Sequence, residues 1–530
     1  MHILTAAEMG LADRRSVEAG VPIAALMENA GRAVARFCEQ HFATDGIIVV
    51  LCGKGNNGGD GFVAARHIGA AARIVRVVLL GKATDLKDDA AAAFHALAYY
   101  DIVEVHNEAD LHEALEGATL IVDAIVGTGF KPPLRGLAAV ARDIVAKMDV
   151  PVVAVDLPSG WDADSRAQRS EDAFRADAVV TFTAPKMAHI FGHLTPGKTF
   201  GPVVVADIGS PAEAVQSSTD LTWAGAAKAL AEKPRDVDGN KGKFGHVLVV
   251  GGSWGKSGAP SMASIAAMRT GAGLVTAAVP SSILPMVAST APELMCMPLA
   301  ERDGSVELSN ADAQSLEKLL NGIKVIAIGP GLGTAGEASD FARALIERTT
   351  LPMVIDADAL NACAGRTDLL RNASNGGRML VLTPHPGEMA RLVGMSVKEV
   401  EADRIGIARR FATEHGVTLV LKGWRTLIAH PDGRIAVNTT GNPSMAKGGS
   451  GDILTGIVAA MLAQYPDDVA SAVEAAVFLH GLAGDFAVQA QDEHTVLATD
   501  TVAHLWQAFR SRVRGEDGFT WIAGTVMSGT

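Results

Sequence analysis

Two glycine-rich runs in this chain of 530 residues hold side chains that could do chemistry. The first, Gly53–Gly61 (GKGNNGGDG), lies between an apolar run and a segment of helical character. Its Gly53, Gly55 and Gly58 match the G-x-G-x-x-G spacing, in which glycines let backbone N–H groups approach a phosphate at a helix N-terminus. The acidic residue that a dehydrogenase carries about 20 residues further on is missing, because the next strand ends Leu79-Leu80-Gly81-Lys82. The run indicates a nucleotide site, but not that of an ordinary NAD dehydrogenase.

Oxygen-bearing side chains follow two further apolar runs in the same half of the chain. Asp123 ends one run and leads into Gly127–Pro133, and Asp156 ends the next run, shortly before Ser159. Amide, carboxylate and hydroxyl oxygens from Asn57, Asp123 and Ser159 would suit a hard cation such as K⁺, Mg²⁺ or Ca²⁺ better than zinc. The alternative is that both aspartates only cap the turns that follow them.

The second run, Gly441–Asp452 (GNPSMAKGGSGD), precedes an apolar helical segment. Consecutive N–H groups at a helix N-terminus form an anion-binding nest that can stabilise a phosphoryl group in transfer. Asp452 in the first turn is placed to take a proton from an attacking hydroxyl. The alternative is an ordinary helix start with a favourable aspartate.

Three more loops of the second half follow consecutive apolar runs, namely Gly329–Gly333, Asp356–Asn361 and Thr383–Glu388. His385, in the third loop, would by itself more often be a structural histidine than a ligand. Its place at a strand end beside two similar loops favours substrate contact instead.

The elements that must position these loops are predicted to form two α/β series. The first has nearly continuous apolar runs separated by helical segments, as in a parallel sheet covered on both faces; the runs are Gly46–Gly53, Arg73–Gly81, Thr119–Gly127, Val150–Gly160, Ala176–Pro185 and Gly201–Gly209. The second series comprises Gly245–Ser253, Gly273–Pro280, Ile323–Gly333, Pro352–Asn361, Met379–Glu388 and Val417–Gly423, followed by a hairpin at Thr426–Thr440. Open α/β sheets bind ligands at the carboxyl ends of their strands, which is where the candidate residues lie.

The boundaries that follow are a first domain over residues 1–215, a linker over 216–235 without strands, a second domain over 236–510 and a loose tail over 511–530. The fold class is α/β in both domains. The first is predicted to be a Rossmann-like doubly wound domain.

Composition excludes several classes of protein. The hydrophobic fraction of 48% suits packed cores, and the net charge of −13 argues against nucleic acid as a partner. The 4 cysteines form no CxxC pair, so neither a disulfide framework nor structural zinc is expected. No signal peptide and no uncharged apolar stretch of about 18 residues is present, which predicts a soluble cytoplasmic protein without a membrane partner.

The first half resembles the YjeF N-terminal family of NAD(P)H-hydrate epimerases, through Leu26–Gly31 (LMENAG), Gly53–Gly61, the Asp123–Gly129 strand end and Asp156–Gly160 (DLPSG). The resemblance implies that Asp156 contacts the substrate and transfers a proton, and that Asn57, Asp123 and Ser159 bind K⁺. It also implies a dinucleotide site made of Asn56, Asn57, Gly58, Gly59, Asp60, Gly127, Thr128, Gly129, Phe130, Lys131, Pro132 and Pro133.

The second half resembles the ribokinase-like superfamily and, within it, the ADP-dependent NAD(P)H-hydrate dehydratases. The motifs that carry this are GPGLG, DADALN, TPHPGE, LKG and GNPSMAKGGSGD, in that order. The resemblance implies that the hydrated substrate contacts Ala259, Gly331, Gly333, His385 and Asp452. It implies an ADP site made of Lys422, Gly423, Trp424, Arg425, Thr426 and Gly451, in which the side chains of Trp424 and Arg425 have no assigned role.

The whole chain is therefore expected to resemble bifunctional NAD(P)H-hydrate repair enzymes, an isomerase joined to a lyase. The implied ligands are hydrated NADH and NADPH, ADP as co-substrate, K⁺ in the first domain and Mg²⁺ in the second, and a homo-oligomer is expected. Two alternatives stay open, a ribokinase-type small-molecule kinase with an accessory nucleotide-binding domain and a non-catalytic nucleotide-binding scaffold.

Overall fold

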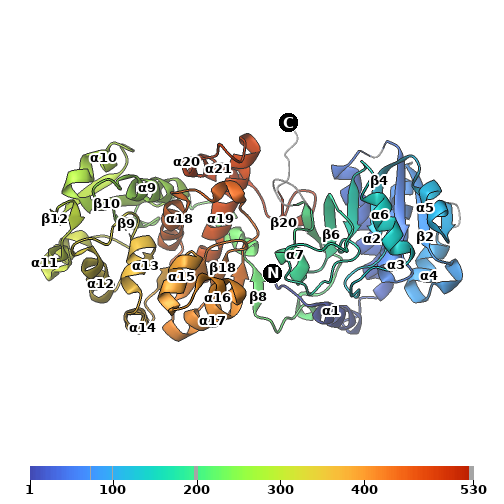
Figure 1. Ribbon diagram of the computed structural model, residues 1–530, viewed down its shortest axis with the longest axis horizontal. Helices are drawn as coiled ribbons and strands as arrows, with labels where there is room; N and C mark the ends of the chain where they lie inside the picture. Colours follow the sequence, from blue (N-terminus) through green and yellow to red (C-terminus); the bar gives the residue numbers. More distant parts are fainter. Residues whose placement is uncertain (44, 72, 98–99, 196–200, 525–530) are drawn as a thin grey trace. The chain divides into compact units, whose positions relative to one another are not determined.

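The computed structural model describes residues 1–530 apart from 44, 72, 98–99, 196–200 and 525–530. The chain forms two compact units (Figure 1). Unit 1 comprises Met1–Thr219 and the C-terminal segment from Val513, and unit 2 comprises Asp220–Arg512. The α/β class predicted for both halves is confirmed by the sheets of the two units.

Unit 1 is built on an 8-stranded sheet of order β20-β7-β6-β5-β4-β1-β2-β3. The order β3-β2-β1-β4-β5-β6 is that of dinucleotide-binding Rossmann folds, as predicted. All pairs are parallel except β20 with β7. The strands are β1 (Ile47–Cys52), β2 (Ile74–Leu80), β3 (Asp101–Val105), β4 (Ala118–Ala124), β5 (Val152–Val155), β6 (Ala178–Phe182), β7 (Val203–Ala206) and β20 (Phe519–Ala523). Of the parallel strands, only β3 was not predicted.

Helices cover both faces of this sheet, which is why its strands are apolar throughout. Val50 and Cys52 of β1 pack into one buried cluster with residues of α2 and α3, whereas Val49 and Leu51 pack into another with residues of α5 and α6. The helices are α1 (Ala6–Glu18), α2 (Ile23–His41), α3 (Asn56–Ala70), α4 (Asp88–His95), α5 (Glu108–Leu115), α6 (Leu137–Val145) and α7 (Met187–Phe191), with short 3-10 turns η1 (Ala83–Asp85) and η2 (Ala212–Ala214).

The segment expected to be a loose tail is instead partly an edge strand of unit 1. Phe519 in β20 is fully buried, and its ring meets that of Phe37 edge-on at 5.4 Å. The Arg36 guanidinium lies 4.6 Å from the centre of the Phe519 ring. The prediction was wrong because a strand as short as β20, isolated behind the charged residues 510–517, gives little periodic signal.

Unit 2 contains a 10-stranded sheet of order β11-β10-β9-β14-β15-β16-β17-β18-β19-β8. The predicted hairpin is present as the antiparallel pair β18–β19. The strands are β8 (Leu221–Trp223), β9 (His246–Val250), β10 (Leu274–Pro280), β11 (Met295–Leu299), β14 (Val325–Ile328), β15 (Met353–Ile355), β16 (Leu380–Leu382), β17 (Thr418–Leu421), β18 (Leu427–Ala429) and β19 (Ile435–Val437), and a separate ribbon pairs β12 (Glu301–Arg302) with β13 (Ser305–Val306).

Much of the segment expected to be a strandless linker belongs to unit 2. It contains β8, the 3-10 helix η3 (Ala224–Lys228) and α8 (Ala229–Glu232). Trp223 is buried, donates from Nε1 to Thr439 Oγ1 at 2.8 Å and meets the Phe478 ring edge-on. The Leu-Thr-Trp strand is too short to stand out in the sequence, so this expectation was wrong.

Two long apolar helices, α18 (Ser450–Gln464) and α19 (Val469–Ala490), form the centre of the helical layer of unit 2. By length and hydropathy α19 alone among the described helices could cross a membrane, but 67% of its apolar window is buried within the fold. The other helices are α9 (Gly258–Thr270), α10 (Leu284–Ala288), α11 (Ala313–Leu319), α12 (Ala338–Arg348), α13 (Ala357–Cys363), α14 (Asp368–Ser374), α15 (Pro386–Val393), α16 (Val397–Ala402), α17 (Arg404–His415), α20 (Ala498–Ala503) and α21 (Leu505–Arg510), with 3-10 turns η4 (Ser281–Ile283), η5 (Leu308–Ala311) and η6 (Pro443–Met445).

Candidate active sites

A cavity of about 620 Å³ opens at the carboxyl ends of the strands of unit 1. Its walls come from α1, α2, the start of α3, the loop after β4 and the ends of β5 and β6. Among the predicted site residues, those that line it are Asn56, Asn57, Asp60, Gly127, Thr128, Gly129, Phe130 and Asp156. Gly58, Gly59, Lys131, Pro132, Pro133, Asp123 and Ser159 do not line it.

The glycines of the first run are needed for close packing as well as for access. A Cβ on Gly53 would lie 2.0 Å from the Ile125 carbonyl oxygen, and one on Gly58 would lie 2.0 Å from the Gly53 carbonyl oxygen. The backbone therefore turns directly from β1 into α3, whose first residues Asn56 and Asn57 line the cavity. This places the positive end of the α3 dipole at the cavity wall, as a phosphate-bearing ligand requires.

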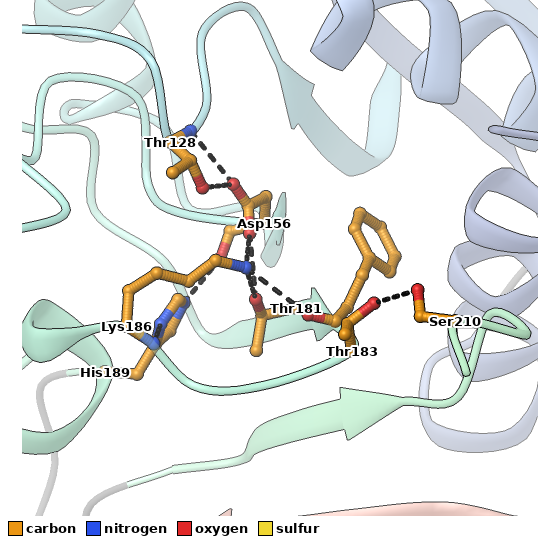
Figure 2. A network of polar contacts seen from close by, with 8 residues as sticks. Thr128, Asp156, Thr181, Thr183, Lys186, His189 and Ser210 are labelled. Atoms are coloured by element: carbon orange, nitrogen blue, oxygen red, sulfur yellow. Dashed lines mark hydrogen bonds and ion pairs between the residues drawn. The ribbon is translucent and has the colours of Figure 1, made fainter. Parts of the chain in front are cut away.

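Asp156 is the centre of a buried network at the end of β5 (Figure 2). Its Oδ1 accepts from Lys186 Nζ and Thr181 Oγ1, both at 2.8 Å. Its Oδ2 accepts from the Thr128 backbone N–H at 2.9 Å and from the Thr128 hydroxyl. Burial alone would raise the pKa of Asp156, but the Lys186 charge and these hydrogen bonds hold that pKa below its usual range. Asp156 is therefore a carboxylate, held in a positive-φ backbone conformation of +65°.

Lys186 and His189, which the sequence analysis did not single out, complete this network. The Lys186 side chain is 1% exposed. His189 accepts from the Lys186 backbone N–H at Nδ1 and donates from Nε2 to the Asp156 carbonyl oxygen at 2.7 Å. Burial lowers the pKa of His189 to about 4, so the ring is neutral. A polar residue just after a buried strand, as in Thr183-Ala184-Pro185-Lys186, was the available signal.

Two more carboxyl groups, Asp13 and Asp60, line the same cavity. Burial, together with the Asp156 charge, raises the pKa of Asp60 well above its usual range. Burial also raises the pKa of Asp13, an effect that Lys186 opposes and Asp156 reinforces. Asp60 was predicted from the glycine loop, whereas Asp13 lies on α1 in a segment that carried no recognisable motif.

Asp123 and Ser159 are in direct contact beneath the cavity. The Asp123 carboxylate is fully buried and accepts from the Ser159 hydroxyl at 2.6 Å and from the Ser159 N–H at 2.7 Å. Burial raises the pKa of Asp123 to about 6. Asp123 also accepts from the Ile125 N–H at 3.3 Å, so the capping role considered for it is present too.

Asn57, in the first turn of α3, lies close to Gly127 in the loop after β4. Its Oδ1 is 2.8 Å, and Asp156 Oδ2 is 3.1 Å, from the point where a Cβ on Gly127 would stand. Its Nδ2 is buried and has no hydrogen-bond partner among the described residues. Asn57 Oδ1 thus lies near Asp156 at the loop after β4, and the Ser159 hydroxyl lies on the Asp123 carboxylate. Amide, hydroxyl and carboxylate oxygens are of the type that hard cations prefer.

In unit 2, the run Gly441–Asp452 ends at the start of α18. Gly449 is the N-cap with φ +96°, and Gly451 and Asp452 lie in the first helical turn. A Cβ on Gly449 would lie 2.6 Å from Sδ of the flexible Met262 side chain, which can move aside, so it is the left-handed backbone conformation that requires glycine here. The run therefore ends in a helix N-terminus with a glycine at its N-cap, and anion binding by its N–H groups stays a prediction.

Asp452 lies in a group of charges at the carboxyl ends of β15, β16 and β17. Lys422 Nζ donates to Asp356 Oδ1 at 3.0 Å and lies 3.8 Å from Glu388 Oε2. It also lies 3.3 Å from the point where a Cβ on Gly451 would stand. Burial and the Asp356 charge raise the pKa of Asp452 to about 6, although Lys422 opposes the shift. A carboxyl with this pKa is largely ionised at neutral pH yet more basic than an ordinary aspartate.

The glycine loop after β14 closes on the loop after β9. Ser253 Oγ donates to the Gly331 carbonyl oxygen at 2.9 Å, and a Cβ on Gly331 would stand 3.0 Å from the Cβ of Ala259. The Gly333 N–H donates to Asp358 Oδ2 at 2.8 Å. The structure thus brings Ala259 and Gly331 into contact on neighbouring loops, and substrate contact by Ala259, Gly331 and Gly333 stays a prediction.

His385 has the structural role that was the predicted alternative to substrate contact. Its Nδ1 accepts from the Gly387 N–H at 3.0 Å and thereby caps α15, while Glu388 accepts from the His385 N–H at 2.8 Å. The His385 Nε2 lies 3.5 Å from Glu388 Oε1, and the side chain is 51% exposed, so the ring is accessible to a ligand from solvent.

Trp424 and Arg425, whose roles the sequence left open, shape the loop after β17. Arg425 is buried, adopts φ +53° and donates from Nη1 to the Thr439 carbonyl oxygen at 2.6 Å. Its guanidinium lies 4.2 Å from the centre of the Trp424 ring, and Arg404 donates to the Trp424 carbonyl oxygen. These contacts hold the Lys422–Thr426 loop in place.

Comparison with known proteins identifies the family to which each half of the chain is similar. Residues 23–188 match the model of the YjeF-related protein N-terminus, and residues 247–506 match that of NAD(P)H-hydrate dehydratase. The bifunctional NAD(P)H-hydrate repair enzyme of Moorella thermoacetica is 41% identical over 96% of this chain and 97% of its own, and that of Pyrobaculum aerophilum is 38% identical over 96% and 98%.

Among solved structures, the ADP/ATP-dependent NAD(P)H-hydrate dehydratase of Bacillus subtilis, co-crystallised with ATP and Mg²⁺, is 33% identical over 56% of this chain and 99% of its own, with a TM-score of 0.48. A ribokinase-like superfamily protein of Enterococcus faecalis is 28% identical over 56% and 97%, with a TM-score of 0.46. On the full-length matches and the two family models, the chain belongs to the bifunctional NAD(P)H-hydrate repair enzyme family, with a YjeF-related epimerase domain followed by an NAD(P)H-hydrate dehydratase domain.

Proposed function

We propose that the two sites act in succession on hydrated nicotinamide nucleotides. The first domain, which is unit 1, interconverts the R and S forms of hydrated NADH and NADPH. The second, which is unit 2, removes water from the S form at the expense of ADP, which yields NAD(P)H, AMP and phosphate. The observation that carries the proposal is that each unit holds a buried or half-buried aspartate, Asp156 or Asp452, beside a glycine-built helix N-terminus.

In the epimerase site, the loops Asn56–Asp60 and Gly127–Pro133 would hold the dinucleotide, and Asp156 would transfer a proton. The cavity of about 620 Å³ supports this, because both loops contribute to its walls. Asp156 is ionised and fixed in orientation by Lys186 and Thr128, so it is positioned to accept a proton from water near the ring, and its lowered pKa means that it gives that proton up again readily.

A potassium ion is proposed on Asn57, Asp123 and Ser159. Among the described residues, the hydrogen-bond donors to the buried Asp123 carboxylate are the Ser159 hydroxyl and the backbone N–H groups of Ser159 and Ile125, so a bound cation would offset the negative charge of this acid. When bound, K⁺ would supply positive charge next to the loop after β4, where the phosphates of the substrate are expected.

In the dehydratase site, Asp452 is proposed to take the proton of the ring hydroxyl. The hydroxyl oxygen then attacks the terminal phosphoryl group of ADP, and AMP departs with the electrons of the broken phosphoanhydride bond. Phosphate then leaves C6, driven by the lone pair of N1, and the N1=C6 iminium that results loses a proton from C5, so that the C5=C6 bond of intact NAD(P)H forms and the electron pair returns to N1. The N–H groups at the start of α18 stabilise the charge on the phosphoryl group in transfer.

Ligand contacts in this site are proposed as the resemblance implied. The hydrated substrate would contact Ala259, Gly331, Gly333, His385 and Asp452, and ADP would contact Lys422–Thr426 and Gly451. The carboxylates of Asp356, Asp358 and Glu388 act electrostatically on Asp452, but the described residues contain no cluster of three acids or histidines that would hold an ion by itself, so Mg²⁺ is proposed to enter together with the ADP phosphates. When bound, Mg²⁺ would offset the charge of the ADP phosphates.

The test is a coupled assay on a mixture of R and S hydrates. With ADP, the absorbance of reduced nicotinamide should return completely, because the R form is converted as the S form is consumed. If only the S fraction were converted, the result would support the dehydratase proposal and contradict the epimerase proposal. A stable phosphorylated product in place of NAD(P)H would instead indicate a ribokinase-type kinase. We further propose a cytoplasmic homo-oligomer, for which light scattering of the purified chain gives the subunit number.

A further inference from the structure

The epimerase cavity holds an acid to which the proposed function gives no role. Asp13, on α1, lines the cavity together with Asp60, Asp156 and Lys186. It interacts electrostatically with Asp156 and Lys186. The match to the family model begins at residue 23, so Asp13 lies outside it.

Inverting C6 of the hydrated ring needs a proton donor as well as a proton acceptor. The C6–O bond breaks with its electron pair on oxygen, the oxygen takes a proton and departs as water, and the lone pair of N1 forms an N1=C6 double bond. Water then adds to C6 from the other face, the double-bond pair returns to N1, and a base takes the surplus proton. Protons and electrons balance without an oxidant or reductant.

Lys186 is poorly placed to be the donor, although it is charged. Its Nζ already donates to Asp156 Oδ1, Thr181 Oγ1 and the Phe182 carbonyl oxygen, at 2.8, 2.8 and 3.4 Å. These contacts use all three hydrogens of the ammonium group. Asp156 is the carboxylate that accepts from Lys186, so it is the base of the pair and a second group must supply the proton.

We propose that Asp13 is the general acid of the epimerase, which protonates the departing C6 hydroxyl while Asp156 accepts the proton of the incoming water. This inference rests on the proposed function. For the reverse inversion the two carboxyl groups exchange roles, as an isomerase that works in both directions requires. The raised pKa of Asp13, caused by burial, keeps its carboxyl protonated above the usual range of an aspartate. Asp13 and Asp156 reach the same cavity from different elements, α1 and the end of β5, so the two carboxyl groups can act on the ring as separate groups.

The test uses the full chain and purified R hydrate without ADP, with the appearance of the S form followed by chromatography. Asp13→Asn should lower kcat by about 100-fold or more with KM changed less than threefold, the size expected for loss of a general acid. Asp13→Glu keeps an acid on a longer side chain and should retain more than a tenth of the wild-type rate. Glu18→Gln, at an exposed position on the same helix, should have no effect.

The pH profile distinguishes a chemical role from a structural one. The groups that face Asp13 are Asp156 and Lys186 from the strand ends, Asp60 from α3 and Arg14 from α1 itself. The wild-type rate should fall as the pH rises through the Asp13 pKa, and this alkaline limb should be absent in Asp13→Asn. ADP-dependent dehydration of purified S hydrate by the same variant should stay normal.

Three results would overturn the assignment. They are an Asp13→Asn rate within threefold of wild type, equal losses in Asp13→Asn and Asp13→Glu, and loss of the alkaline limb in Asp60→Asn but not in Asp13→Asn. If the wild-type chain itself produced no S form, the proposed epimerase function would fail, not the role of Asp13.

Discussion

Lys186 and Asp156 form an ion pair of 2.8 Å in which the two side chains are 1% and 8% exposed. Two charges so far from water are stable only because each compensates the other and both have further hydrogen bonds. The pair also fixes the direction of the Asp156 carboxylate in the cavity wall, with Thr128 on its second oxygen. Structure and chemistry in unit 1 therefore depend on the same contact.

Replacing Lys186 by Met should destabilise unit 1 by about 3–5 kcal/mol, because it leaves the Asp156 carboxylate buried without its cation. The epimerase rate should fall while dehydration of S hydrate persists. Calorimetry of the full chain measures the loss of stability. The matched control is Lys131→Met, whose exposed contacts with Asp162 and Asp164 should contribute less than about 1 kcal/mol.

The same pair predicts a pH dependence of stability. The folded-state pKa of Asp156 is depressed, so its contribution is present above the unfolded pKa of about 3.9 and is lost as the pH falls further. In Lys186→Met that depression disappears, so the variant should lose less stability than wild type when acidified below that value. An equal acid response in both proteins would contradict the assigned ionisation of Asp156.

Asp452→Asn should lower the dehydration rate by about 100-fold or more, since a positioned base contributes at least that much. In the wild type, the rate should rise with pH through about 6, the raised pKa of Asp452, because only the ionised form accepts a proton. The variant should lose this acid limb. Epimerisation by the same variant serves as the folding control. A dehydration rate near wild type would show that Asp452 is not the base.

Asp123→Asn should abolish the response of the epimerase to K⁺. The substitution removes the buried negative charge, which a cation on Asn57, Asp123 and Ser159 would neutralise. The measurement is the epimerisation rate with K⁺ exchanged for a bulky organic cation at constant ionic strength, in wild type and variant. Dehydration should not change. A K⁺ response that survives in Asp123→Asn would place the ion elsewhere.

The sequence predicted those parts of the molecule that long apolar runs and glycine loops determine. Val49 and Leu51 belong to a run that only a sheet buried on both faces accommodates, and the loops at its strand ends could be located from it. Lys186 was missed because a lone lysine near a strand has no periodic signature, and its partner Asp156 lies 30 residues earlier. Asp13 was missed because a single acid on a helix resembles an ordinary solvated residue until the fold places that helix against the cavity.

Phe519→Ala should destabilise unit 1 by about 3–5 kcal/mol, the usual cost of removing a fully buried phenylalanine. The ring packs edge-on against Phe37 of α2 and beneath the guanidinium of Arg36, so its loss affects the epimerase unit although the residue lies at the far end of the chain. Thermal inactivation of the two activities in one sample is the measurement: epimerisation should be lost at a lower temperature than in wild type, while dehydration is lost at the same temperature. Trp506→Ala, which removes a side chain that is 59% exposed in unit 2, should leave the inactivation temperature of the epimerase unchanged. If both activities shifted equally in Phe519→Ala, β20 would not belong to the cooperative unit of the first domain.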